Sequence, residues 1–255
     1  MHIHSLRTLL LAGLGALAPA TIAIAQDANR PPIGVFGSPQ VAMIFYVAHG
    51  ADNACGPGCS DWIAAEGAVQ WDTYKRLINI LDRQNGKKLP LVIHASGRSD
   101  LKVSTGMGRI LHDRGIDTMD GATIVAACAD KSEADCFLLK RPGGPLEAKL
   151  NTSGERCDIA CVLILAGGIR RSLAPTTRVI LSGMEIRNRL APNVSDERRS
   201  ALTLGYDNEL RAYLREMGID TRVMDIVDQN SGLERATELP PADWVRLHLV
   251  TPAPQ

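Results

Sequence analysis

Short apolar runs alternate along the chain with segments whose apolar residues recur at helical spacing. The runs predict strands over residues 43–49, 62–69, 89–95, 123–127 and 179–181. The helical spacing predicts helices between Asp72 and Gly86 and over residues 101–114, 159–166, 196–217 and 242–247. Residues 141–145 are expected to lie in a long loop. This order indicates a parallel or mixed sheet covered by helices, in one α/β domain with a helical C-terminal part.

Polar residues and glycines mark the ends of the predicted helices. Asp72 and Asp196 stand where N-caps are expected, and Gly115 and Gly218 stand where helices end. The apolar residues of the first helix share one face, which predicts that this face is buried. They are Tyr74, Leu77, Ile78 and Leu81.

The N-terminus has the pattern of a secretory signal. Arg7 precedes an apolar stretch over residues 9–24, which ends in the small-residue sequence Ala23-Ile24-Ala25. An uncleaved anchor helix is the alternative, but the stretch is short for a bilayer span of about 20 residues and contains Pro19. We therefore predict cleavage near Ala25, a flexible segment over residues 26–40 and a domain over residues 41–255. The mature chain is expected in the periplasm or outside the cell, without stable membrane insertion.

Composition narrows the classes of partner. The chain has 28 basic and 28 acidic residues among 255, so its formal net charge is zero and gives no general attraction to nucleic acid. Aromatic residues make up only 4%, which leaves little material for stacking bases or sugars. Small-molecule, peptide and protein partners remain, and nucleic acid is not expected.

All six cysteines follow the predicted cleavage site: Cys55, Cys59, Cys128, Cys136, Cys157 and Cys161. An even number in an oxidising compartment favours disulfides, and pairing of near neighbours is the simplest of fifteen connectivities. The spacing does not choose among them, and it fixes the Cys157/Cys161 pair least, since one helical turn separates these residues. Zinc bound by two C-x-x-x-C pairs is the alternative, but their spacing differs from that of common zinc ribbons. No histidine has metal-ligand spacing, and no metal is predicted.

Several strings between residues 55 and 251 occur in a characteristic order. They include Cys55-Gly56-Pro57-Gly58-Cys59, Leu91 to Arg98, Cys157-Asp158-Ile159-Ala160-Cys161, Pro175 to Ser182 and Leu247 to Thr251. In their shared order they resemble an exported bacterial branch of the Clp protease proteolytic subunit and crotonase fold. The resemblance implies a repeated β-β-α superhelical core with a helical C-terminal part. It also implies a homo-oligomer by analogy.

The resemblance places a backbone oxyanion hole at the turn after a strand, which here reads Ser96-Gly97-Arg98. Arg98 stands where a second glycine is expected, so a Cβ restricts the approach of a substrate. Crotonases act on coenzyme-A thioesters, but coenzyme A is a cytoplasmic metabolite. No cofactor is expected for this chain.

The resemblance also places a serine, a histidine and an acid at positions that hold other residues here. Ile159 stands in place of the nucleophilic serine, Ser182 in place of the histidine, and Ala236 near the place of the acid. Isoleucine offers neither a proton nor a lone pair for attack. We therefore expect an inactive protein that binds a peptide or protein in a vestigial cleft.

A second hypothesis is a working periplasmic serine hydrolase or peptidase with a relocated nucleophile. Ser96, with His94 as base, is the main candidate, and Ser182 is another. His94 and Ser96 are two residues apart on a strand, so their side chains share a face and run parallel, which argues against direct contact.

Overall fold

The structure is a computed structural model that describes residues 41–184, 195–230 and 235–252. The chain divides into two units, residues 1–31 and 32–255, and every described residue belongs to the second unit. The predicted signal peptide and the predicted flexible segment, residues 1–25 and 26–40, lie outside the described residues.

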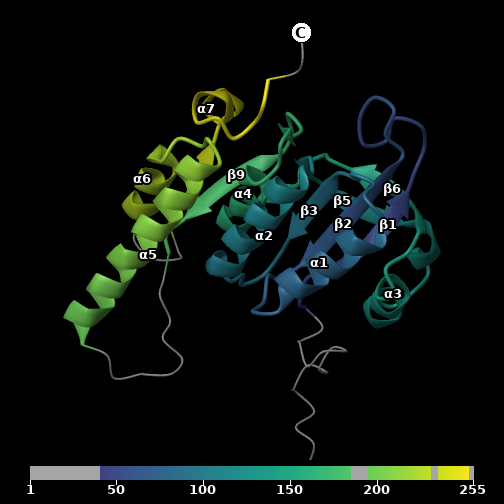
Figure 1. Cartoon of the computed structure of the whole chain (residues 1–255), viewed down its shortest axis with the longest axis horizontal. Coiled ribbons are helices and arrows are strands. Elements are labelled where there is room, and N and C mark those ends of the chain that lie inside the picture. Colours follow the sequence, from purple (N-terminus) through teal and green to yellow (C-terminus); the bar gives the residue numbers. More distant parts are fainter. Residues whose placement is uncertain (1–40, 185–194, 231–234, 253–255) are drawn as a thin grey trace, which may run out of the picture. The chain divides into compact units, whose positions relative to one another are not determined.

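The strands of the second unit form two sheets (Figure 1). The larger sheet has the order β5 (Ala122–Val125), β6 (Leu146–Asn151), β1 (Ile44–His49), β2 (Asp61–Gly67), β3 (Leu91–Ala95), β4 (Thr118–Asp120) and β8 (Arg171–Ser172). Strands β2, β3, β4 and β8 are parallel, whereas β1 and β2 are antiparallel and so are β5 and β6. The smaller sheet has the order β10 (Ala236–Leu239), β9 (Arg178–Ser182) and β7 (Arg156–Cys157). The predicted mixed α/β class is confirmed.

Seven α-helices connect and cover the described strands. They are α1 (Thr73–Arg83), α2 (Leu101–Arg114), α3 (Glu133–Lys140), α4 (Ile159–Ala166), α5 (Asp196–Glu216), α6 (Arg222–Gln229) and α7 (Pro241–Arg246). A short 3-10 helix covers Ala126–Cys128. No helix among the described residues is long and apolar enough to cross a membrane.

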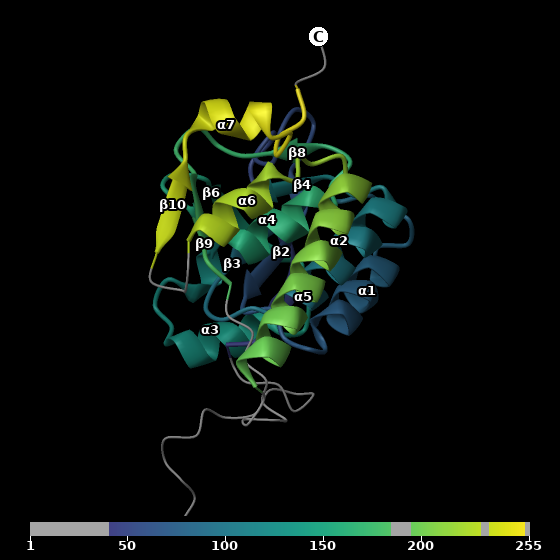
Figure 2. The same ribbon diagram turned by 90° about the vertical axis from the view of Figure 1, so that its left-hand side faces the viewer.

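Each face of the larger sheet has its own apolar cluster. One cluster joins strand residues such as Ile63, Leu91 and Ile93 to α1, α2, α4 and the C-terminal helices. The other lies around Tyr46 and Trp62. Figure 2 shows α5 alongside α2 and α2 alongside α1. The sheet is thus buried on both faces, as its near-continuous apolar strands require.

The helix boundaries follow from local capping. Asp100 accepts a hydrogen bond from the Val103 N–H at 3.0 Å and starts α2, and Gly115 ends it in the left-handed conformation, as predicted. Helix α5 is capped by Ser195, whose hydroxyl accepts from the Arg198 N–H, and not by Asp196 as predicted. A hydroxyl one residue earlier fills the capping role, so the helix starts at Asp196.

Two expectations about the elements are wrong for physical reasons. In α1 the buried apolar residues are Leu77, Ile80 and Leu81, while Tyr74 is exposed, because a tyrosine hydroxyl is readily solvated at the helix edge. The loop expected around residues 141–145 is short and lies between α3 and β6, both unpredicted. Helix α3 is short and has no buried residue, and β6 carries charged side chains, so neither gives a clear apolar period.

Helices α2, α4 and α5 approach closely at Gly108. A Cβ there would overlap the Tyr213 side chain and lie 2.9 Å from the Leu163 backbone oxygen. The Tyr213 hydroxyl donates to that same oxygen at 2.7 Å, which ties α5 to α4. Glycine at residue 108 lets the three helices meet.

We predict that Gly108→Ala destabilises the protein by about 3 kcal/mol, because the added methyl group overpacks this contact. Gly106→Ala is the matched control, since a Cβ at Gly106 meets nothing within 4 Å and alanine favours helix by up to about 1 kcal/mol. Urea unfolding measures both variants. Equal effects of the two substitutions would contradict the close packing at Gly108.

Candidate functional site

The carboxyl ends of the parallel strands meet at one edge of the larger sheet. Glu66 on β2 pairs in register with His94 on β3, and the turn Ser96-Gly97-Arg98 follows β3 directly. The Ser96 N–H donates to the Gly67 oxygen at 3.1 Å, and Gly97 has a φ of +68°, which favours glycine. This turn is the predicted oxyanion turn.

The turn leaves two backbone donors exposed. Among the described residues, no acceptor receives the N–H of Gly97 or of Arg98. Both residues are exposed, and the following segment is held by Asp100, whose N–H donates to the Val69 oxygen at 2.9 Å. The turn can therefore donate to a carbonyl oxygen of a bound molecule.

Ile159 begins the buried helix α4. Asp158 caps the helix by accepting a hydrogen bond from the Cys161 N–H at 3.1 Å, so its carboxylate stabilises the first turn of α4. The Ile159 side chain is 8% exposed and belongs to the main apolar cluster. At the position where the resemblance implies a nucleophile, this chain therefore has an apolar core residue.

Ser182 and Ala236 lie opposite each other. They are register partners in the antiparallel pair β9 and β10, and Cys157 on β7 pairs with Val179 on the other side of β9. Helix α4 contacts both β7 and β9. The fold thus brings the elements that carry Ile159, Ser182 and Ala236 together, but their side chains offer one hydroxyl and no base.

His94 pairs with a carboxylate that the sequence analysis did not single out. Its Nδ1 lies 3.0 Å from Oε2 of Glu155, whose other oxygen accepts from the Asn151 amide at 3.0 Å. The His94 side chain is 42% exposed. No hydrogen bond joins His94 to Ser96 among the contacts of the described residues, in keeping with side chains that run parallel along a strand.

Asp120, at the end of β4, is a buried acid that the sequence analysis missed. It is 1% exposed, its Oδ2 accepts from the Thr177 hydroxyl at 3.2 Å, and its Oδ1 lies 3.6 Å from Sγ of Cys161. Burial raises the pKa of Asp120 to about 6, against the lowering effect of the Thr177 hydrogen bond. Strand β4 has only three residues, so no pattern in the sequence could have indicated that the Asp120 side chain is buried there.

All three disulfides join near neighbours, which confirms the simplest pairing. They are Cys55–Cys59, Cys128–Cys136 and Cys157–Cys161, with Cα atoms 5.1, 5.2 and 5.1 Å apart. The first closes a loop, the second joins the 3-10 helix to α3, and the third joins β7 to α4. Asp120, Cys157 and Cys161 have ligand atoms within 4.8 Å of one another, but sulfurs bonded to each other present no thiolate to a metal.

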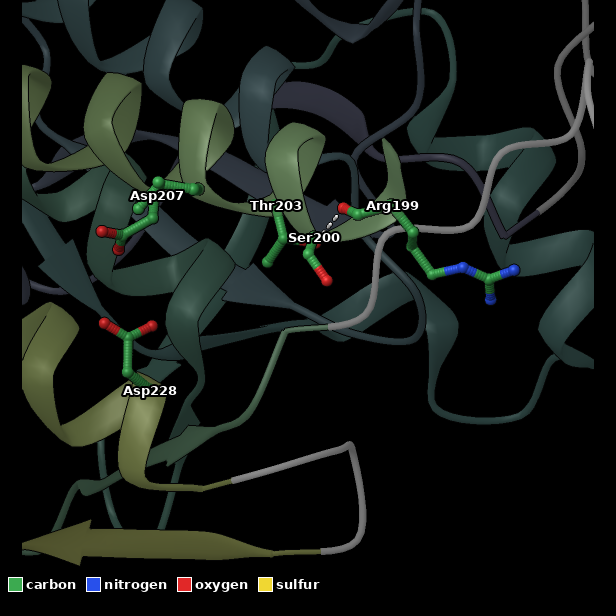
Figure 3. Close-up of a pocket in the computed structure, with 6 residues that line it drawn as sticks. Arg199, Ser200, Thr203, Asp207 and Asp228 are labelled. Carbon is green, nitrogen blue, oxygen red and sulfur yellow. Dashed lines mark hydrogen bonds between the residues drawn. The ribbon is translucent and has the colours of Figure 1, made fainter. Parts of the chain in front are cut away.

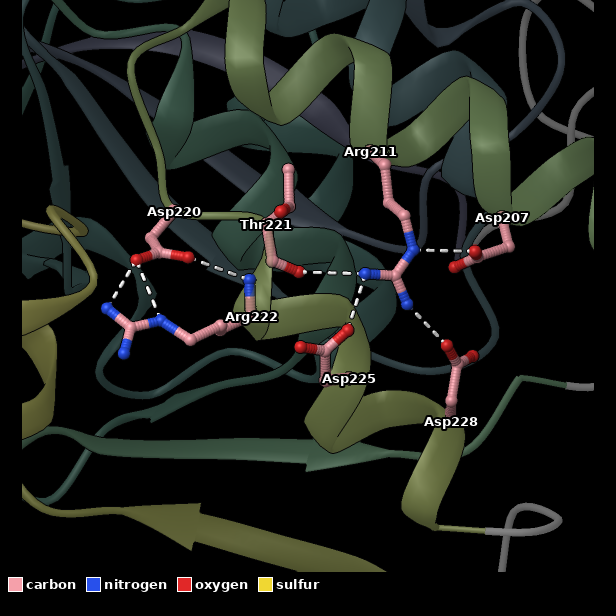
Figure 4. Close-up of polar contacts among 7 residues, drawn as sticks. All are labelled: Asp207, Arg211, Asp220, Thr221, Arg222, Asp225 and Asp228. Carbon is pink, nitrogen blue, oxygen red and sulfur yellow. Dashed lines mark hydrogen bonds and ion pairs between the residues drawn. The ribbon is translucent and has the colours of Figure 1, made fainter.

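A separate hollow of about 380 Å³ lies between α5 and α6 (Figure 3). Its lining includes Thr203, Asp207 and Asp228 and contains none of the predicted site residues. Arg211 binds three carboxylates beside it, Asp207, Asp225 and Asp228, at 2.5 to 2.6 Å (Figure 4). One guanidinium thus holds the two helices together and leaves a net negative charge there.

Comparison with known proteins gives low similarity. No family model matches the chain, and no curated protein matches it. A mutant of the 1510-N membrane-bound stomatin-specific protease in complex with a substrate peptide is similar at a TM-score of 0.42 and 12% identity, over 80% of this chain and 72% of that chain. A second mutant of that protease gives 0.40 and 14%, over 70% of each chain. A structure described only as an enzyme gives 0.40 and 14%, over 72% of this chain and 89% of that chain.

We predict that Asp120 makes stability depend on pH. A carboxyl whose pKa is about 6 when folded and 3.8 when unfolded favours folding at low pH, and that stabilisation is lost as pH rises from about 4 to about 6. The loss amounts to about 3 kcal/mol. Asp120→Asn removes this slope, because an amide stays neutral and still accepts from Thr177.

Urea unfolding at several pH values measures this effect, with the exposed carboxylate variant Asp82→Asn as the control for loss of one charge. If Asp120→Asn and the natural chain show parallel stability curves, the carboxyl is not buried as described.

Proposed function

We propose that the chain is an exported, disulfide-stabilised protein of the Clp protease/crotonase-like type, with a repeated β-β-α superhelical core and no catalytic activity at the inherited site. It binds an extended segment of a peptide or protein at the carboxyl edge of the larger sheet. The observation that carries the proposal is the burial of Ile159 at the start of α4, with Ser182 facing Ala236 nearby. None of these three side chains is a base or an acid.

Binding is supported by the exposed turn after β3. Gly97 and Arg98 are exposed residues, and no acceptor among the described residues receives their N–H groups, which suit the carbonyl oxygens of an extended peptide. Arg98 adds a positive charge beside them. A protein that has lost its nucleophile but kept these donors would hold a peptide without cleaving it.

A second candidate, a serine hydrolase with a relocated nucleophile, is favoured by the His94 and Glu155 pair. A carboxylate that orients a histidine is what general base catalysis needs, and Ser96 with the open donors of Gly97 and Arg98 follows in the same segment. Its weakness is geometric, since no hydrogen bond joins Ser96 to His94 in the described structure.

We predict that a fluorophosphonate serine-hydrolase probe leaves the natural, oxidised protein unlabelled. A variant that restores the implied residues, Ile159→Ser with Ser182→His and Ala236→Asp, is expected to be labelled at residue 159, because the elements that carry these positions are adjacent. Peptide mass spectrometry locates the label. Labelling of the natural chain at Ser96 would establish the hydrolase instead, and Ser96→Ala is its control.

For binding, we predict that peptides selected on the natural protein from a displayed random library bind more weakly to Arg98→Glu, by about tenfold, because the reversed charge repels peptide carbonyl oxygens. Lys87→Glu is the control, since Lys87 is also exposed but lies outside this edge. Fluorescence anisotropy measures both. Equal weakening by the two substitutions, or a failure to select any peptide, would contradict binding at this turn.

The predicted homo-oligomer remains a proposal by analogy. Leu202 and Leu204 on α5 are 46% and 63% exposed and are the side chains that such a contact would cover.

A further inference from the structure

The Cys157–Cys161 disulfide differs from the other two in what surrounds it. Both of its sulfurs belong to fully buried residues, whereas Cys55, Cys59, Cys128 and Cys136 are half-buried. Among the described contacts it is the disulfide with a side-chain carboxylate against a sulfur, Oδ1 of Asp120 at 3.6 Å from Sγ of Cys161. This contact serves no purpose in a permanent disulfide, because an oxidised sulfur has no proton to donate.

The carboxylate is fixed in place by its neighbours. Oδ2 of Asp120 accepts from the Thr177 hydroxyl, which leaves Oδ1 directed at the sulfur. The ionisable groups around Asp120 are His94 on β3, Glu155 before β7 and Asp158 at the cap of α4. Glu155 is itself paired with His94, whose half-exposed ring connects the cluster to solvent.

We propose that Cys157 and Cys161 form a reversible redox pair, and that Asp120 favours its reduced form by accepting a hydrogen bond from the Cys161 thiol. A dithiol reductant supplies two electrons and two protons. The bond between the two sulfurs breaks, each sulfur takes one proton, and the reductant becomes a disulfide. The Cys161 S–H then donates to Oδ1 of Asp120, which lacks this donor in the oxidised state.

The carboxylate affects the equilibrium between the disulfide and the dithiol, whereas the burial of the sulfurs affects the rate of reduction. A hydrogen bond to an ionised acceptor is about twice as strong as one to a neutral acceptor, so the carboxylate shifts the equilibrium toward the dithiol. Burial of both sulfurs means that a reductant reaches them only after the first turn of α4 opens. Reduction is therefore slow and favourable, in contrast to an exposed disulfide. The proposal does not depend on the proposed function.

The test measures the reduction equilibrium of each disulfide in one sample. The oxidised protein is equilibrated with mixtures of reduced and oxidised dithiothreitol, quenched with acid and alkylated, and peptide mass spectrometry reads each pair separately. Cys128–Cys136 serves as the internal control. For the natural protein, we expect the reduction constant of Cys157–Cys161, divided by that of Cys128–Cys136, to rise about tenfold between about pH 5 and about pH 8, as Asp120 ionises.

Two variants test the role of the carboxylate. In Asp120→Asn the ratio is expected to be about tenfold lower than in the natural protein at about pH 8 and to lose its dependence on pH. Thr177→Val keeps the charge but removes the other hydrogen bond of the carboxylate, so it is expected to keep the high ratio at about pH 8. If Asp120→Asn fails to fold, the pH series of the natural protein and Thr177→Val still decide the question.

Two results would overturn the proposal. One is a ratio in the natural protein that does not change with pH. The other is loss of the circular dichroism signal of the folded chain in step with reduction of Cys157–Cys161, since that would make the disulfide a structural requirement of the fold.

Discussion

Complete burial of α4 is the constraint on which the rest of the structure depends. All eight residues of this helix are apolar and buried, so it has no side that can face water. Strands β3 and β4 of the larger sheet, β7 and β9 of the smaller sheet, and helix α2 each contact it. The two sheets and the helical layer are therefore arranged around one short segment, Ile159–Ala166.

The same burial decides the chemistry at the start of the helix. A helix N-terminus that emerges from a sheet edge can present a reactive side chain to a cleft, because its backbone donors stabilise negative charge. Here the first residue is Ile159, which packs into the core, and the polar group at this end is the capping carboxylate of Asp158. In the neighbouring turn, the N–H groups of Gly97 and Arg98 have no acceptor within the part of the chain that the structure describes. The arrangement fits recognition of a backbone better than attack on it.

The elements with a strong local pattern of residues could be predicted from the sequence. Helix α4 was predicted with its observed ends because it is uniformly apolar and is followed by Gly167 and Gly168, and α2 because Gly115 ends an amphipathic segment. Strand β4 and helix α6 were missed. Three residues are too few to show a period, and α6 has only eight residues, in which Asp225 and Asp228 interrupt the apolar ones.

The candidate site also has features that the sequence could indicate and features that it could not. Residues next to one another in sequence could be singled out: the oxyanion turn through the resemblance, and the cysteine pairs as the simplest of fifteen connectivities. Contacts between distant segments could not: His94 meets Glu155, and Asp120 meets Cys161, only because parallel strands end at a shared edge. The pairing of Ser182 with Ala236 likewise depends on β10, whose exposed residues carry no strand pattern.

Native-state hydrogen exchange of the oxidised protein tests the central role of α4 most directly. If this helix organises the fold, its amides beyond the first turn, Leu163 to Ala166, exchange only through global unfolding, with the same free energy as that measured by urea, while the amides of the surface helix α3 exchange through smaller openings. Exchange of the α4 amides as fast as those of α3 would contradict the account.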